Sequence, residues 1–190
     1  MKSGRIVGFV WACLVIAFAL QGETATAQGR SPSSPAPVGT PVVTMIECGE
    51  GYTSHELYDM TITVTKVVRG QKTPDLIGGA GSPIQAPEAG SEYVLARIRV
   101  KYLARGLPGN CNHELRPEQF TALSSDGREY KAPSVAAPKP ALSGSLHSGE
   151  SLEGWVAFLV AKEDSKPLMT FTADPTGAAQ HGGNIWFQLH

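Results

Sequence analysis

The stretch EYVLARIRVKY, residues 92–102, decides the fold because its side chains alternate in character. Charged residues stand at Arg97, Arg99 and Lys101, each between two apolar neighbours. The apolar set is Val94, Ala96, Ile98, Val100 and Tyr102. A period of two places successive side chains on opposite faces of a strand, whereas a helix repeats every 3.6 residues. The stretch therefore predicts a β-strand with one buried and one solvated face.

Seven further short segments are apolar or alternating and are bounded by turn residues, which is typical of strands. They are residues 42–46, 60–65, 120–123, 129–131, 151–160, 168–173 and 184–189. Asp126 and Gly127 tolerate positive φ and predict a hairpin turn between 120–123 and 129–131. We expect no helix. Seven to eight strands predict an all-β protein, an antiparallel β-sandwich, with a closed barrel as the second choice.

The first 27 residues have the pattern of a secretory signal peptide. Lys2 and Arg5 precede an uncharged apolar run at 6–20, and Ala25-Thr26-Ala27 fits a cleavage site. A membrane span needs about 20 apolar residues, so no stable membrane span is predicted. We expect a signal peptide at 1–27, a disordered Pro/Ser-rich linker at 28–41 and a sandwich domain at 42–190. The product would be secreted or periplasmic.

Cleavage would remove Cys13 and leave Cys48 and Cys111 in an oxidising compartment, where paired thiols form disulfides. The sequence therefore predicts one bridge between them. The chain carries 16 Lys+Arg against 17 Asp+Glu, a formal charge of -1, which argues against nucleic acid as a partner. Two Gly/Pro-rich stretches, 70–91 and 132–143, exceed the usual loop length and are expected to be functional or disordered.

Two features are candidate ligand-binding sites. The basic stripe of Arg97, Arg99 and Lys101 could bind an anionic ligand, but such a row is more often a solvated face paired with carboxylates, here Glu118 or Glu153. Trp155 and Trp186 lie in segments that are apolar on both faces. Trp186 is therefore a candidate for an interface, with burial in the core as the competing interpretation.

Catalytic and metal motifs are weak. Neither His55-Glu56 nor His113-Glu114 has the second histidine, four residues on, that a zinc-protease helix needs. Cys48, Cys111 and His113, together with His55 and Met60, could form a copper or zinc site if the cysteines stay reduced, and His55 and His113 could still bind metal weakly if the cysteines are joined. The serines at 143–148 lack a nucleophile-elbow motif and fit a turn better than a hydrolase site. No catalytic residue, resident metal or cofactor is predicted.

Five segments in this order resemble a family of secreted bacterial immunoglobulin-like domains of unassigned function, akin to a small immunoprotective antigen exported by mycobacteria. They are MTITVTKVV (60–68), GSEYVLARIRVKY (90–102), QFTALSSDGREY (119–130), LSGSLHSGESLEGWVAFLV (142–160) and PLMTFTADP (167–175). The resemblance covers about residues 57–175. It implies an immunoglobulin-like β-sandwich outside the cytoplasm and supplies no catalytic residues.

The sequence thus favours an exported, non-enzymatic immunoglobulin-like module that presents loops to an unknown protein or cell-envelope ligand. The alternative is an extracytoplasmic protein that handles copper or zinc through the Cys, His and Met residues. A hydrolase with a site assembled from distant residues is a third, weaker hypothesis.

Overall fold

The computed structural model describes residues 28–48, 56–78, 84–107, 111–173, 179–181 and 183–190, so the predicted signal peptide at 1–27 lies outside the described part. The described residues form ten strands, one short α-helix and one turn of 3-10 helix. In chain order these are β1 (Pro41–Cys48), β2 (Glu56–Arg69), α1 (Lys72–Gly78), β3 (Ser91–Ala104), β4 (His113–Leu115), η1 (Pro117–Gln119), β5 (Phe120–Leu123), β6 (Gly144–Leu146), β7 (Ser151–Ala161), β8 (Leu168–Phe171), β9 (Ala179–His181) and β10 (Ile185–Gln188).

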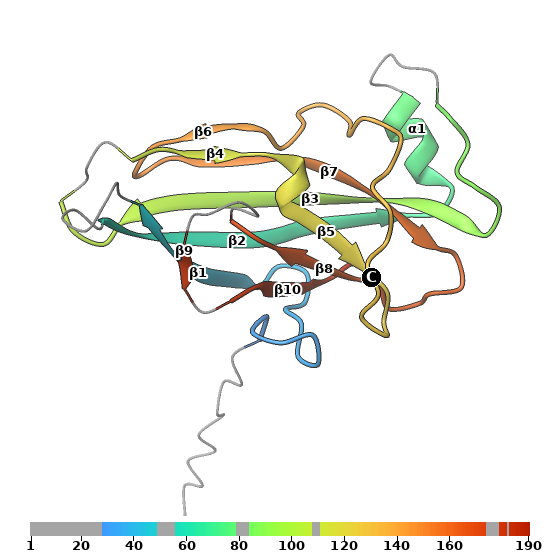
Figure 1. Ribbon diagram of the computed structural model, residues 1–190. Coiled ribbons are helices and arrows are strands. Elements are labelled where there is room, and N and C mark those ends of the chain that lie inside the picture. The colour runs from blue at the N-terminus through green and yellow to red at the C-terminus, as the bar shows by residue number, and fades with distance from the viewer. Residues whose placement is uncertain (1–27, 49–55, 79–83, 108–110, 174–178, 182) are drawn as a thin grey trace, which may run out of the picture.

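These strands form two antiparallel sheets and a separate two-stranded ladder. The larger sheet has the order β7-β3-β2-β1-β9, the smaller has the order β10-β8-β5, and β4 pairs with β6. Figure 1 shows β5 crossing the long strands β2 and β3, with β8 and β10 near one another below β2 in this view. The predicted all-β, immunoglobulin-like antiparallel sandwich is confirmed, and the described strands do not close into a barrel.

The main core lies between the two sheets and follows the alternation of β2 and β3. The inward side chains of β3 are at most 1% exposed, and they are Val94, Ala96, Ile98, Val100 and Tyr102. The smaller sheet contributes Phe120, Met169, Phe171 and Phe187 to the same core. Burial of each large apolar side chain stabilises the fold by about 1.5–3 kcal/mol, so the alternating pattern sets which face of each strand packs inward.

A second apolar cluster lies on the outer face of the larger sheet. It consists of Val68, Ile77, Tyr93, Leu95, Trp155 and Ala157, with Val135, Ala137 and Leu159 packed against it. This cover explains why β7 is apolar on both faces although it is an edge strand. It also corrects the expectation of no helix: α1 buries Ile77 in this cluster, but its seven residues are too few to show a helical period.

The segment 28–41 is not the disordered linker that its composition predicts. The Gly29 carbonyl accepts a hydrogen bond from the Trp186 amide (2.9 Å), and the Ala36 amide donates to the Trp186 carbonyl (2.9 Å). Ala36 is fully buried, and Pro41 already begins β1. Polar, Pro-rich composition indicates little apolar surface to bury, but the backbone of this segment pairs with β10, which composition does not reveal.

The predicted hairpin after β5 is present. The Gly127 amide donates to the Ser124 carbonyl (2.8 Å), and Gly127 has a φ of 87°. The returning arm is shorter than predicted, because a single bridge joins Leu123 to Glu129 and the chain then leaves the sheet at Tyr130.

Candidate functional site

The candidate site is a cleft on the open side of the sandwich, where edge strands of the two sheets meet. β7 is an edge strand of the larger sheet, and β5 is an edge strand of the smaller sheet. Residues 130–142, which we call the strap, follow the hairpin and cross this opening. Side chains of β5, β7 and the strap all line the cleft.

The cleft has a volume of about 460 Å³, within the usual range of small-ligand sites. Its lining is mostly apolar, with Glu118, Glu129 and Lys131 as the charged members. The principal apolar residues are Phe120, Ala122, Val135, Ala136, Ala137, Val156, Ala157 and Phe158. Three consecutive β7 residues line it, although successive strand side chains point to opposite faces. The cleft therefore opens against the edge of β7 rather than against one face.

One end of the strap is attached to β7 by its backbone. The Leu142 amide donates to the Trp155 carbonyl (3.0 Å), and the Trp155 amide donates to the Pro140 carbonyl (2.8 Å). This approach requires Gly154, because a Cβ there would lie 2.6 Å from the Leu142 nitrogen and 2.7 Å from the Ala141 carbonyl. A glycine inside an apolar strand is a known signal of close backbone approach, and sequence analysis missed it here.

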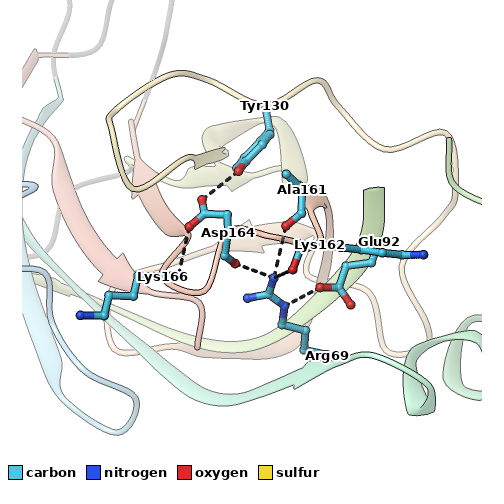
Figure 2. Close-up of polar contacts among 7 residues, drawn as sticks. All are labelled: Arg69, Glu92, Tyr130, Ala161, Lys162, Asp164 and Lys166. Carbon is cyan, nitrogen blue, oxygen red and sulfur yellow. Dashed lines mark hydrogen bonds and ion pairs between the residues drawn. The ribbon is translucent and has the colours of Figure 1, made fainter. Parts of the chain in front are cut away.

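The other end of the strap begins at Tyr130, whose hydroxyl donates to the Asp164 carboxylate (2.8 Å), as Figure 2 shows. The same carboxylate accepts hydrogen bonds from the backbone amides of Ser125 and Lys166, each 3.0 Å. Tyr93 adds a midpoint contact, a hydrogen bond between its hydroxyl and that of Ser134 (3.3 Å). The strap is therefore held at both ends and near its middle.

Arg69 fixes the turn that carries Asp164. Its guanidinium donates to the Asp164 carbonyl (2.6 Å) and to the carbonyls of Ala161 and Lys162 (3.3 Å each), and it pairs with Glu92 (2.6 Å), all visible in Figure 2. These contacts join the turn after β7 to β2 and β3. The position of Tyr130 at the cleft is thus determined by residues far away in sequence.

The Tyr130–Asp164 pair has shifted ionisation. Burial, followed by the hydrogen bond and the charge of Asp164, raises the pKa of Tyr130 to about 12. Burial alone would raise the pKa of the Asp164 carboxyl, but the hydrogen bonds from Tyr130, Lys166 and Ser125 outweigh it and hold that pKa below its ordinary value. A neutral phenol and a charged carboxylate are therefore the stable forms across the neutral range.

The basic stripe lies outside the cleft, on the solvated face of β3. Glu153 of β7 forms ion pairs with Arg97 (2.7 Å) and Arg99 (2.6 Å), one of the two carboxylates that the sequence suggested. The Arg97 guanidinium also lies 5.9 Å from the Trp155 ring centre. Lys101 is exposed. One carboxylate therefore balances part of the stripe, and the binding of an anion there stays a prediction.

The two tryptophans differ in environment. Trp155 is 8% exposed and packs in the outer cluster rather than between the sheets. Trp186 is half-buried on β10, beside the backbone of residues 29 and 36. The structure brings neither Trp186 nor the basic stripe to the cleft, so the residues predicted for ligand binding do not form one site.

The predicted disulfide between Cys48 and Cys111 is present and joins the end of β1 to the segment before β4, with a Cα–Cα distance of 6.4 Å. These sulfurs are therefore not free thiolate ligands. His113 is buried and forms a hydrogen bond with Gln119 (3.1 Å). His55 lies outside the described residues. Within the described part of the chain, no three His, Cys, Asp or Glu residues are grouped as metal ligands.

No helix in the described part of the chain is long and apolar enough to cross a bilayer.

Comparison with known proteins gives a family and a set of distant structural similarities. No curated protein matches the sequence. The ycdA protein of Bacillus subtilis has a TM-score of 0.49 at 13% identity over 68% of this chain, which spans only 35% of that protein. The yjhA protein of the same species (TM-score 0.44, 13% identity) aligns over 75% of this chain and 86% of its own. The secreted protein MPT63 of Mycobacterium tuberculosis (TM-score 0.45, 12% identity) aligns over 75% of this chain and 91% of its own.

The family match covers residues 53–181, which includes β2, both edge strands of the cleft, the strap and the Asp164 turn. The chain therefore belongs to the family described as "Domain of unknown function (DUF4352)".

Proposed function

We propose that this protein is an exported, non-enzymatic binding module that holds its ligand in the cleft beneath the strap. The observation that carries the proposal is the cleft itself: an apolar site of about 460 Å³ whose outer wall, the strap, is attached at both ends. A pre-formed apolar site with few polar groups is the usual form of a binding pocket. The loop that the sequence singled out at 132–143 supplies most of this wall.

Export is supported by the sequence and by the disulfide. The first 27 residues have the charge and hydropathy pattern of a signal peptide. Cys48 and Cys111 are joined across 63 residues of sequence, and such bridges persist in oxidising compartments. Both features favour a secreted or periplasmic location.

The composition of the cleft supports binding rather than catalysis. Its described lining contains no histidine or cysteine, and its charged residues Glu118, Glu129 and Lys131 are exposed at the rim. General acid–base catalysis needs a titratable group positioned against the reacting atoms, usually with a shifted pKa. Tyr130 has such a shift, but its hydroxyl is engaged by Asp164.

The experiment is a titration of the protein, residues 28–190, with the apolar fluorescent probe 1-anilinonaphthalene-8-sulfonate. Saturable binding of one probe per protein is expected. Ala136→Trp adds a large ring at a residue that lines the cleft and should weaken the affinity by about tenfold or more. Ala89→Trp makes the same change at an exposed position outside the cleft and should leave affinity unchanged. The absence of saturable binding, or equal affinities in the two variants, would reject the cleft as a ligand site.

A further inference from the structure

The edge of β7 that borders the cleft carries unused backbone hydrogen-bonding groups. In β7 the even-numbered residues pair with β3, as the bond from the Lys162 amide to the Gly90 carbonyl shows at the end of this ladder. The odd-numbered residues point away from β3, because the hydrogen bonds of an antiparallel pair alternate along the strand. Trp155 follows this rule, since both its amide and its carbonyl bond to the strap.

Ala157 and Leu159 have the same orientation as Trp155, but no described residue bonds to their outward amides and carbonyls. The strap covers the edge at Trp155, and Tyr130 stands at its other end near the Asp164 turn. Between these two points no described residue pairs with the edge. Ala157 is itself 7% exposed, so its backbone groups border the cleft rather than the general surface.

The strap is poorly suited to fill this gap with its own backbone. Pro133, Pro138 and Pro140 lack the amide hydrogen that a strand needs for pairing, and proline is confined to sheet edges and bulges. The cleft separates strap residues such as Ala136 from the edge of β7. The sequence of the strap thus leaves a strand edge unpaired inside an apolar cleft, although buried backbone groups are almost always paired.

We propose that the ligand of the cleft is an extended peptide segment that adds to the free edge of β7 and becomes a sixth strand of the larger sheet. This inference rests on the proposed binding role of the cleft and names the class of its partner. Main-chain bonds to Ala157 and Leu159 supply affinity, and the apolar lining receives alternate side chains of the peptide. An acyl chain would fill the apolar volume of the cleft, but it has no hydrogen-bonding groups for the outward amides and carbonyls of Ala157 and Leu159.

The test compares three peptides with identical side chains. The first is Lys-Val-Thr-Val-Thr-Val-Lys, and the other two have the same sequence with N-methyl groups on alternate amides, one in each register. The unmodified peptide is expected to bind residues 28–190. The N-methyl peptide of the register that faces β7 should bind at least about tenfold more weakly, because it lacks the donors for pairing.

Hydrogen exchange measured by NMR locates the bound peptide. The amides of Ala157 and Leu159 should slow on binding, whereas the Trp155 amide, already bonded to the strap, should change little. Ala136→Trp should remove both the binding and the slowing, and Ala89→Trp should retain both.

Failure of this inference is distinguishable from failure of the proposed function. If 1-anilinonaphthalene-8-sulfonate or dodecanoate occupies the cleft but the peptide does not, the cleft is a ligand site and strand addition is wrong. Equal affinity of both N-methyl registers and the unmodified peptide would also overturn strand addition. If no probe occupies the cleft, the proposed function itself is wrong.

Discussion

Replacing Gly154 by alanine tests whether the strap is held by close packing of its backbone on β7. An alanine Cβ would lie 2.6 Å from the Leu142 nitrogen and 2.7 Å from the carbonyl carbon and oxygen of Ala141. These are backbone atoms on the strap, so no side-chain rotation relieves the overlap. Gly154 lacks a positive φ, so the backbone of β7 itself accepts alanine. The strap must therefore move away from the strand.

The magnitude follows from what this movement breaks. Two hydrogen bonds join Trp155 to Pro140 and Leu142, and each contributes about 0.5–1.5 kcal/mol. Leu142 is 1% exposed, and complete loss of its burial would cost about 1.5–3 kcal/mol more. With both bonds broken and about half of the Leu142 burial lost, we expect the free energy of unfolding to fall by about 2–4 kcal/mol. Without the overlap, alanine in a strand would instead raise the free energy of unfolding by about 0.5–1 kcal/mol. The sign of the measured change therefore shows whether the overlap exists.

Urea unfolding of the wild type and variant gives the change in free energy, and hydrogen exchange shows where it arises. The amides of Leu142 and Trp155 should lose protection beyond the global loss, whereas amides between β2 and β3 should lose only the global part. Gly106→Ala is the matched control, because Gly106 has no positive φ and no atom within 4 Å of the added Cβ. Unchanged or increased stability of Gly154→Ala would refute the reasoning that the strap depends on this contact.

Three further predictions follow from the contacts of individual groups. Reduction of the bridge between Cys48 and Cys111 should lower the free energy of unfolding by about 4 kcal/mol, by the chain-entropy argument, and lower Tm by roughly 10 °C. An unchanged calorimetric transition under reductant would contradict a stabilising role of the bridge. Asp164→Asn should lower the free energy of unfolding at pH 7. The difference in this free energy between variant and wild type should narrow as pH falls below about 4, because a carboxyl of lowered pKa loses its stabilising effect on protonation. A constant difference in denaturation midpoints across this range would show that the Asp164 carboxylate is not the stabilising group. Glu153→Gln should cost about 1 kcal/mol or less, because the partner guanidiniums are about half exposed, and a cost that does not fall with added salt would contradict an ion-pair effect.

The candidate site shows where prediction from sequence succeeds and where it fails. Long Pro-rich stretches are exceptions to normal loop lengths, so residues 132–143 could be marked from the sequence as either functional or disordered. Gly154 could also have been found, as a glycine inside an apolar strand. Asp164 and Arg69 carried no signal, because a single carboxylate in a turn or arginine at a strand end looks like any solvated charge.

Alternation of side chains along 92–102 was sufficient to predict the strand, its buried face and the sandwich class, because burial of one face is a local consequence of a period of two. The cysteine count predicted the bridge, because removal of the predicted signal peptide would leave two thiols. Which strands lie at the edges, and what covers them, depends on pairing between distant segments, and local sequence does not encode it. Only the tertiary structure placed β5 beside β7, laid the strap across them and left the unpaired edge of β7 at Ala157 against the cleft.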